Sequence, residues 1–446
     1  MKRTLFILLL LPLGVSAQIS SEQQAKIDSL KQVIQTAGND SFIVNALRIW
    51  DTIIYSSDPD LDLELNEKIE KLCLKNLERK LSPSEQTIYQ VSLSSALTNI
   101  GIYHEQKGDY TPALDAHLRS LSIAKKIENE VAIGRALYNI GNIYKRQGNL
   151  AKATKYLTKS LGIHEKLGLP QGVASCLNNI GNIYYKKGDY SEALNYYART
   201  LAIREEINDE KKVGLSLNNI GAVHEILGDY SLAMDYYTRS FNLYNKIGHK
   251  SGAALSQSNI GNIYALQGDH KQAMLQFTSS LKKREALGDK QGIASCLNNL
   301  SHCYFEQNDY ARAIEYGKRG LAIAQEIGVV QEIRHAAEVL YLSYQQLGKH
   351  QLALSMHEIY VQSRDSFFSE ANHQEVVRQE YKYAYEKRVA ADIPINAEAE
   401  KMLDAQLKMQ TGQSKLKLVD TQRCVLQWSI LNIVNTLYCY YFIGRF

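Results

Sequence analysis

Hydrophobic and polar positions alternate along this chain with the period of an α-helix, most clearly in the stretch QGVASCLNNIGNIYYKKG. Its apolar residues Val173, Leu177, Ile180 and Tyr184 lie three or four positions apart, so they share one helical face. Gly188 follows them, and glycine is the residue type that most often ends a helix in the left-handed conformation. The pattern predicts an amphipathic helix of about 18 residues that ends at Gly188.

A second amphipathic helix follows directly. Asp189 has the side chain of an N-cap, and Glu192 lies three residues later, which is the spacing of a capping box. The next stretch, YSEALNYYARTLAIREEI, again has apolar residues on one face, and this face is predicted to be buried. Two antiparallel helices, each about 27 Å long, would form one unit. The predicted buried side consists of Ala193, Leu194, Tyr197, Leu201 and Ile203.

The same unit recurs every 40 residues. The hexamer NIGNIY stands at residues 139–144, 179–184 and 259–264. Imperfect copies begin at Asn99, Asn219 and Asn299, and a weaker copy begins at Val339. A fixed period in this range is typical of a solenoid, in which each unit packs only on its neighbours. The sequence therefore predicts seven units over residues 84–388, preceded by N-terminal helices over residues 18–83.

A glycine lies near the middle of the first helix in five units, at positions 101, 141, 181, 221 and 261. Glycine inside a helix costs about 0.5–1 kcal/mol relative to alanine, so we expect it to permit close approach of the two helices. Ser301 and Tyr341 replace it in the last two units, which predicts looser packing there. The alanines expected to face the gap are Ala113, Ala153, Ala193, Ala233, Ala273, Ala313 and Ala353.

The pattern Leu177-x-x-Ile180-Gly181-x-x-Tyr184, followed by Ala193-x-x-x-Tyr197, resembles the tetratricopeptide repeat. Each unit is six residues longer than the 34-residue form and lacks the proline that usually ends its second helix. In this it is similar to the extended class found in kinesin light chains, spindle-orientation adaptors and bacterial signalling proteins. The resemblance implies an all-α fold, a right-handed solenoid of stacked antiparallel helix pairs. Residues 40–80 are interpreted as a degenerate first unit.

The resemblance also implies a binding surface, because the first helix of each unit lines a concave groove in this family. Asparagine amides donate and accept, which suits a peptide backbone, and basic side chains suit an acidic group or a terminal carboxylate. A protein or peptide ligand is therefore expected. The alternative, that the repeated asparagines are solvated or bond a neighbouring helix, stays open. The other repeated asparagines, at 139, 179, 219, 259 and 299, are expected to be structural. The candidate groove residues are Tyr138, Asn142, Lys145, Arg146, Asn178, Asn182, Lys186, Asn218, Asn262 and Asn298, with Arg135 nearby.

Catalytic and metal-binding patterns are missing from the sequence. His-Glu pairs begin at His104, His164 and His224, but the second histidine of a zinc-protease motif is replaced by glycine each time. No phosphate-binding loop or nucleophile elbow is present, and the 11 histidines have no metal-ligand spacing. We therefore predict no enzymatic activity, no catalytic residues, no metal and no cofactor.

The net charge and the cysteines indicate which partners and which disulfides to expect. The net charge of +4 is too small to indicate a nucleic-acid partner. The six cysteines do not form a disulfide framework, since Cys176 and Cys296 are three units apart. Cys296 and Cys303 are two turns apart on one helix, beyond disulfide reach. The cysteines are therefore expected to be small buried apolar residues.

The two ends of the chain carry targeting signals. Residues 1–17 have a basic start, a short apolar run and the small-residue site Val15-Ser16-Ala17, which together predict a secretory signal peptide. Residues 389–423 form a polar helical linker. Residues 424–443 hold no charge over about the length needed to cross a bilayer, which predicts a transmembrane segment. The alternatives are a helix lying in the membrane interface or packing against a second copy of the chain, and an aberrant tail.

This layout is similar to that of Bacteroidetes-type signalling proteins, whose repeats lie outside the inner membrane. In that group a cytoplasmic histidine kinase, nucleotide cyclase or serine phosphatase follows, whereas this sequence stops three residues after the apolar segment. The favoured interpretation is an exported scaffold, anchored on the periplasmic side of the inner membrane, that binds a protein or peptide as part of a signalling system. The alternatives are a truncated sensor remnant of such an enzyme and a soluble periplasmic assembly factor.

Overall fold

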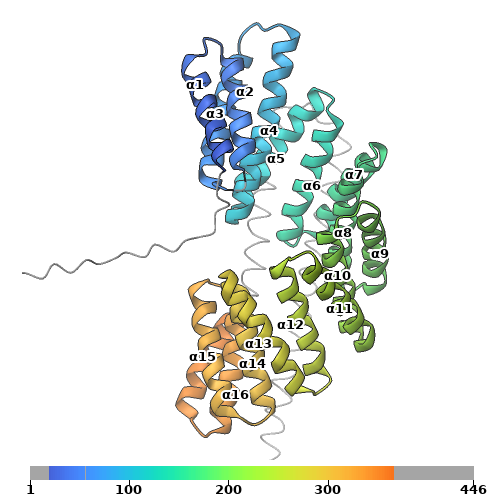
Figure 1. Cartoon of the computed structure of the whole chain (residues 1–446), viewed down its shortest axis with the longest axis vertical. Helices are drawn as coiled ribbons and strands as arrows, with labels where there is room; N and C mark the ends of the chain where they lie inside the picture. Colours follow the sequence, from blue (N-terminus) through green and yellow to red (C-terminus); the bar gives the residue numbers. More distant parts are fainter. Residues whose placement is uncertain (1–19, 56, 366–446) are drawn as a thin grey trace, which may run out of the picture. The chain divides into compact units, whose positions relative to one another are not determined.

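The structure of this protein, a computed structural model, describes residues 20–55 and 57–365 (Figure 1). These residues belong to a compact unit, Met1–Val376, and the second unit, Val377–Phe446, lies outside them. The regular elements of the described part are α-helices, and residues 350–365 are helical as well. The helices are α1 (Ser21–Thr36), α2 (Asp40–Ile54), α3 (Pro59–Leu77), α4 (Pro83–Lys107), α5 (Tyr110–Lys126), α6 (Glu130–Arg146), α7 (Leu150–Lys166), α8 (Pro170–Lys187), α9 (Tyr190–Glu206), α10 (Glu210–Leu227), α11 (Tyr230–Lys246), α12 (Lys250–Leu266), α13 (His270–Leu287), α14 (Lys290–Glu306), α15 (Tyr310–Glu326) and α16 (Val330–Gln346).

The predicted helix pairs are confirmed. Each unit from α4 and α5 to α14 and α15 is a pair of helices in contact, and each second helix packs on the first helix of the next unit. Contacts are confined to near neighbours in the sequence, which is the organisation of a helical solenoid. The chain is therefore an all-α repeat solenoid, as its 40-residue period indicates.

The N-terminal helices extend the stack. Helices α2 and α3 contact each other, and they bury apolar residues against α4. Leu47, Ile54 and Ile69 are fully buried in this cluster, and Leu97 joins them from α4. The first complete unit therefore packs on protein rather than ending in an exposed apolar face.

The mid-helix glycines lie where two helices approach closely, as predicted, but the partner is not the alanine. A Cβ on Gly181 would lie 2.7 Å from Cε1 of Tyr197, a ring four residues after Ala193. The alanines are buried beside this contact. The aromatic or aliphatic side chain of the second helix thus fills the space that the glycine leaves open. The equivalent pairs are Gly101 with His117, Gly141 with Leu157, Gly221 with Tyr237 and Gly261 with Phe277.

In the sixth unit the glycine lies on the second helix, and the larger residue of the pair lies on the first helix. Ser301 replaces the glycine on α14, and Gly317 stands on α15 where the other units have a large side chain. A Cβ on Gly317 would lie 2.9 Å from Oγ of Ser301, and this hydroxyl donates to the carbonyl oxygen of Ala313 at 2.7 Å. The size change is compensated, so the looser packing predicted at Ser301 does not occur.

Four cysteines lie in the described part, and all are free and buried, as the sequence predicts: Cys73, Cys176, Cys296 and Cys303. Cys424 and Cys439 lie outside it, as do residues 1–17, the linker 389–423 and the predicted membrane segment 424–443. None of the helices within residues 20–55 and 57–365 combines the length and apolar character needed to span a bilayer.

The glycine contact gives a prediction with an internal control. Gly221→Ala should lower the free energy of unfolding by about 1–3 kcal/mol, because the new methyl would overlap the ring of Tyr237. Gly162→Ala on α7 should raise it by about 0.5–1 kcal/mol, because no atom lies within 4 Å of the new methyl. Urea unfolding of both variants checks this, and equal effects would show that the glycines do not mark close contacts.

The buried His117 should make the folded state less stable at acid pH. Its ring is fully buried, neither ring nitrogen has a hydrogen-bond partner among the described residues, and burial lowers its pKa from 6.5 to about 4. The unfolded chain therefore binds a proton between these pH values that the folded chain does not. Stability should fall by up to about 3 kcal/mol as the pH drops from about 6.5 to about 4.

His117→Leu provides the test, because Leu157 occupies the equivalent position opposite Gly141. The thermal midpoint of this variant should change less than that of the unaltered chain between about pH 7 and about pH 5. An identical loss of stability in both proteins would assign the acid sensitivity to other groups.

Candidate functional site

A chain of asparagine amides links the first helices of successive units. In each of four units, the first helix has an asparagine immediately before an Ile-Gly or Leu-Ser pair. The Nδ2 group of this asparagine donates to an asparagine of the preceding unit. We call this row the asparagine ladder. Four of the five predicted structural asparagines thus bond to a neighbouring helix, whereas the buried Nδ2 group of Asn139 has no hydrogen-bond partner among the described residues. The bonds run from Asn179 to Asn142 (2.8 Å), from Asn219 to Asn178 (3.1 Å), from Asn259 to Asn218 (3.4 Å) and from Asn299 to Asn262 (3.2 Å).

Three of the predicted groove residues lie inside the stack rather than on its surface. Asn178, Asn218 and Asn298 are 9%, 4% and 0% exposed. The Nδ2 group of Asn218 donates to the hydroxyls of Ser240 and Ser256, each at 2.9 Å. A buried amide has to be hydrogen-bonded, and these amides find their partners in adjacent helices. The structure thus differs from the expectation that these three point into a groove: they join units to one another.

The Nδ2 group of Asn298 shows the same arrangement, whereas its buried Oδ1 atom has no hydrogen-bond partner among the described residues. The Nδ2 group donates to the carbonyl oxygen of Glu332 at 3.1 Å and to Oε2 of Glu332 at 2.8 Å, which ties α14 to α16. A Cβ on Gly320 of α15 would lie 2.2 Å from its Oδ1 atom. The amide therefore occupies space that a larger residue at position 320 would fill.

The other predicted polar residues are half-buried and keep part of their surface. Tyr138 accepts from Asn179 at 3.0 Å, and Asn182 accepts from the hydroxyl of Tyr197 at 2.6 Å. Asn142 and Asn262 accept through Oδ1, and their Nδ2 groups donate to no residue in the described ranges. Of the predicted asparagines, these two therefore keep an Nδ2 donor that no described residue uses.

The predicted basic residues gather where α6 and α8 end. Lys145 is half-buried and donates to Oδ1 of Asn179, and burial lowers its pKa to about 8, helped by the charges of Arg146 and Lys186. Arg146 is exposed and pairs with Glu105 at 3.0 Å. Lys145 and Lys186 form no ion pair with any described carboxylate. We call Lys145, Arg146 and Lys186 the lysine cluster, and it carries an excess of positive charge.

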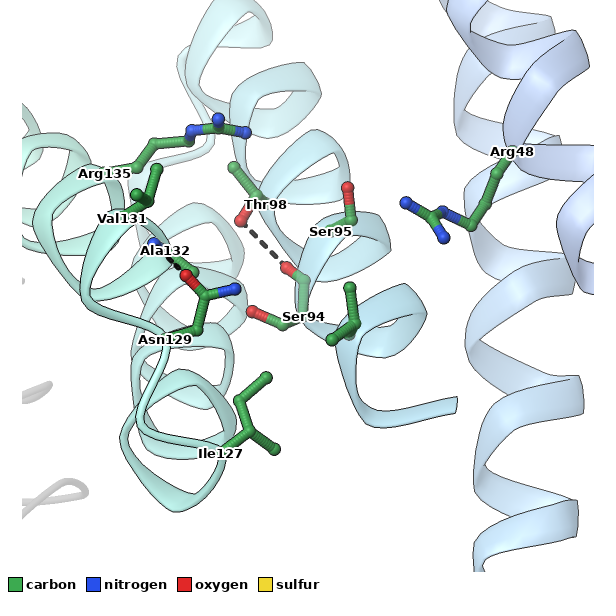
Figure 2. Close-up of a pocket in the computed structure, with 10 residues that line it drawn as sticks. Arg48, Ser94, Ser95, Thr98, Ile127, Asn129, Val131, Ala132 and Arg135 are labelled. Atoms are coloured by element: carbon green, nitrogen blue, oxygen red, sulfur yellow. Dashed lines mark hydrogen bonds between the residues drawn. The ribbon is translucent and has the colours of Figure 1, made fainter. Parts of the chain in front are cut away.

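A cavity that the sequence analysis missed lies between α2, α4 and α6 (Figure 2). Its volume is about 290 Å³. Figure 2 shows Arg48 extending from α2 toward Ser95, while Arg135 lies beside Thr98 on the other side. Arg48 lies on α2, before the regular 40-residue repeats, where no repeated position indicates it. The lining residues are Arg48, Val91, Ser94, Ser95, Thr98, Ile127, Asn129, Val131, Ala132 and Arg135.

Metal ligation has no visible basis in the part of the chain that the structure describes. No group of three or more His, Cys, Asp or Glu side chains is placed to hold an ion there. His164 lies against Ser160 and Cys176 in a buried polar cluster, with its pKa lowered by burial. His224 lies near Asp229 at a helix end, at 3.3 Å. Both histidines therefore make contacts within the protein, and neither belongs to the lysine cluster.

Comparison with known proteins agrees with this architecture. Models of the tetratricopeptide repeat match residues 132–206, 178–241, 212–286 and 293–327. No curated protein matches the chain.

Solved structures with the same fold include three bacterial regulators. The apo form of the quorum sensor NprR from B. thuringiensis is 15% identical (TM-score 0.56), with 78% of this chain and 100% of that chain covered. Aspartyl phosphate phosphatase F from Bacillus subtilis is 14% identical (TM-score 0.55), with 78% and 96% covered. The Rap conjugation gene regulator of plasmid pLS20, in complex with the Phr* peptide, is 14% identical (TM-score 0.53), with 80% and 96% covered. At these identities the likeness shows the fold alone. The repeat matches and the observed helix pairs show that this chain contains tetratricopeptide repeats.

Proposed function

We propose that this protein is a non-enzymatic scaffold that binds a peptide, or an extended segment of a protein partner, across the first helices of its central units. The observation that carries the proposal is the lysine cluster. Lys145 is half-buried beside two other cations, and no described carboxylate pairs with it. Its described hydrogen-bond partner is the neutral Oδ1 of Asn179, so a ligand that brings a carboxylate would bind favourably here.

The free asparagine donors supply the second part of the recognition. Asn142 lies one turn before Lys145 on α6, and its Nδ2 group has no described acceptor. A donor at this position suits a peptide carbonyl, while the lysine cluster suits an acidic side chain nearby. The pLS20 regulator, which shares the fold, was solved with a bound peptide, and this supports peptide binding in the present chain.

The location we propose is the extracytoplasmic side of a membrane, as the sensory part of a signalling system. The support is the signal-peptide pattern of residues 1–17 and the uncharged segment 424–443. Membranes washed with alkaline carbonate should retain the protein. Its release would favour a soluble factor in the same compartment.

The first prediction for this site concerns charge. Lys145→Glu combined with Lys186→Glu should weaken binding of acidic peptides by about tenfold or more, because charge-assisted contacts become repulsive. The matched control is Lys155→Glu with Lys159→Glu, which changes the charge equally at exposed positions of α7. Enrichment of acidic members from a library of short random peptides provides the measurement. An equal loss of acidic-peptide binding in both double variants would show only a general effect of charge. It would contradict a specific contribution of Lys145 and Lys186.

The second prediction concerns pH. Because the pKa of Lys145 is about 8, its amine is charged below this pH and neutral above it. The affinity for acidic peptides should therefore fall as the pH rises from about 7 to about 9. Lys145→Arg should remove most of this dependence, since arginine stays charged throughout. Fluorescence anisotropy of one enriched peptide checks both statements, and a pH profile unchanged by the substitution would contradict them.

A further inference from the structure

We propose that Asp51 of α2 and Asp62 of α3 share one proton and form a pH-sensitive clamp that holds the N-terminal helices on the first complete unit, α4 and α5. The clamp is separate from the peptide surface of the proposed function and does not depend on it. It involves buried acidic groups for which neither the repeat pattern nor the lysine cluster gives a role.

Both carboxylates gather around one amide nitrogen. Nδ2 of Asn66 lies 2.6 Å from Oδ1 of Asp51, 3.2 Å from Oδ1 of Asp62 and 2.8 Å from the carbonyl oxygen of Asp62. Asp51 is 7% exposed and Asp62 is 5% exposed. An amide nitrogen carries two hydrogens, so it cannot donate a full hydrogen bond to all three acceptors. Two buried carboxylates in this position repel each other, and a proton on one of them removes the repulsion and supplies a further donor.

No cation in the described part of the chain neutralises the pair. Neither Asp51 nor Asp62 forms an ion pair there. Arg48 lies one turn before Asp51, but its described hydrogen bond is to the hydroxyl of Ser92 at 3.3 Å. The second oxygen of Asp51 accepts from Nδ2 of Asn99 at 3.0 Å, and this donor is neutral. Burial and the neighbouring Asp51 raise the pKa of Asp62 to about 8, so its carboxyl group keeps a proton at neutral pH.

The other ionisable groups described around the pair hold their charge near neutral pH. Tyr55, at the end of α2, lies within electrostatic reach of both carboxylates. Burial and these carboxylates raise its pKa above the usual value of about 10, so its hydroxyl stays protonated. Glu105 of α4 and Arg135 of α6 also contribute to the potential at Tyr55, and Glu105 is paired with Arg146 at 3.0 Å. At this junction the shared proton is therefore the one that titrates between about pH 6.5 and about pH 8.

The hydrogen-bond network joins three helices. Asp51 belongs to α2, Asp62 and Asn66 belong to α3, and Asn99 belongs to α4. The bond from Asn99 to Asp51 carries the network from the N-terminal helices into the first complete unit. The same three helices bury apolar side chains against one another. Loss of the proton would leave a second negative charge between them, and water can solvate this charge fully only when α2 and α3 move away from α4.

The direction of the pH effect follows from the pKa of Asp62 in the closed and the opened state. In the closed state this pKa is about 8, and in the opened state, where water reaches the carboxyl group, it returns to about 4. The closed state therefore binds one more proton between about pH 4 and about pH 8. Opening should become up to about tenfold more favourable for each pH unit in this range and should level off above about pH 8. The clamp thus holds more firmly in mildly acid than in mildly alkaline solution.

The first experiment uses Cys73 of α3 to report opening, because this cysteine is fully buried in the apolar cluster of the same helices. Cys176, Cys296 and Cys303 are buried in the repeats and serve as internal references. The full chain is treated with a maleimide, and mass spectrometry gives the labelling rate of each cysteine. Each rate is divided by the rate in the unfolded chain at the same pH, because the thiol itself becomes more reactive as the pH rises.

The normalised rate of Cys73 should rise about tenfold or more between about pH 6.5 and about pH 8, while that of Cys296 should stay unchanged. This range lies above the one in which His117 affects stability. A constant rate for Cys73, or an equal rise for Cys296, would overturn the clamp.

Variants assign the effect to the acidic pair. Asp62→Asn removes the titrating group and keeps a neutral donor beside Asp51, so the normalised rate of Cys73 should no longer depend on pH. Glu64→Gln is the matched control, since Glu64 is exposed on the same helix, and this variant should keep the full dependence. A full pH dependence in Asp62→Asn would overturn the assignment. If Asp62→Asn unfolds, Cys296 becomes labelled as fast as Cys73, and the comparison of the two cysteines in the unaltered chain still decides.

The second experiment detects the proton itself. Exposed carboxyl groups are ionised at pH 7, so the infrared carbonyl band of a protonated carboxyl group should appear in the unaltered chain and be absent from Asp62→Asn. The band should disappear as the pH rises through about 8. Its absence from the unaltered chain at pH 7 would overturn the shared proton. Its presence together with a normalised rate of Cys73 that does not change with pH would show that the proton does not control the junction, and this too would overturn the clamp.

Discussion

The rest of the structure depends on one contact, the insertion of a large side chain of the second helix against the mid-helix glycine of the first. At Gly181 and Gly221 the rings of Tyr197 and Tyr237 occupy the space that any Cβ would need. This fixes how closely the two helices of a unit approach and at which turn they meet. Because the contact recurs at the same place in successive units, every unit presents the same two faces to its neighbours. Ser301 and Gly317 show that the constraint is the summed size of the pair, not the glycine itself.

Buried polar contacts complete the fit between helices. A serine of the second helix donates to a carbonyl oxygen of the first helix, as Ser160 does to Gly134 at 2.7 Å and Ser240 to Gly214 at 2.8 Å. The asparagine ladder then links unit to unit at the other side of the first helix. Buried hydrogen bonds of this kind are satisfied only in one register, so they specify the stacking as well as stabilise it. The remaining donors and cations are the groups that the proposed ligand would contact.

The unpaired cations occur in two places that differ in chemistry. The lysine cluster presents flexible amines at the ends of α6 and α8, and burial already lowers the pKa of Lys145. The cavity presents two guanidinium groups from helices of different units, Arg48 and Arg135, above an apolar wall. Amines act as point charges, whereas guanidinium forks fix the orientation of a carboxylate. One face of α6 carries residues from both places, Arg135 and Lys145.

The sequence by itself determined the repeat, the helix pairs and the close approach at the glycines, because these depend on periodicity and on local side-chain size. It also identified Lys145, Arg146 and Lys186 as a basic group. It could not decide which asparagines are available to the proposed ligand, since Asn142 and Asn178 carry the same side chain on the first helices of successive units. Only the stacking of units buries Asn178 and leaves the donor of Asn142 available. Likewise Arg48 and Arg135 are 87 residues apart in the chain. Their convergence on one cavity follows from how α2 and α6 pack around α4, a long-range arrangement that no local pattern encodes.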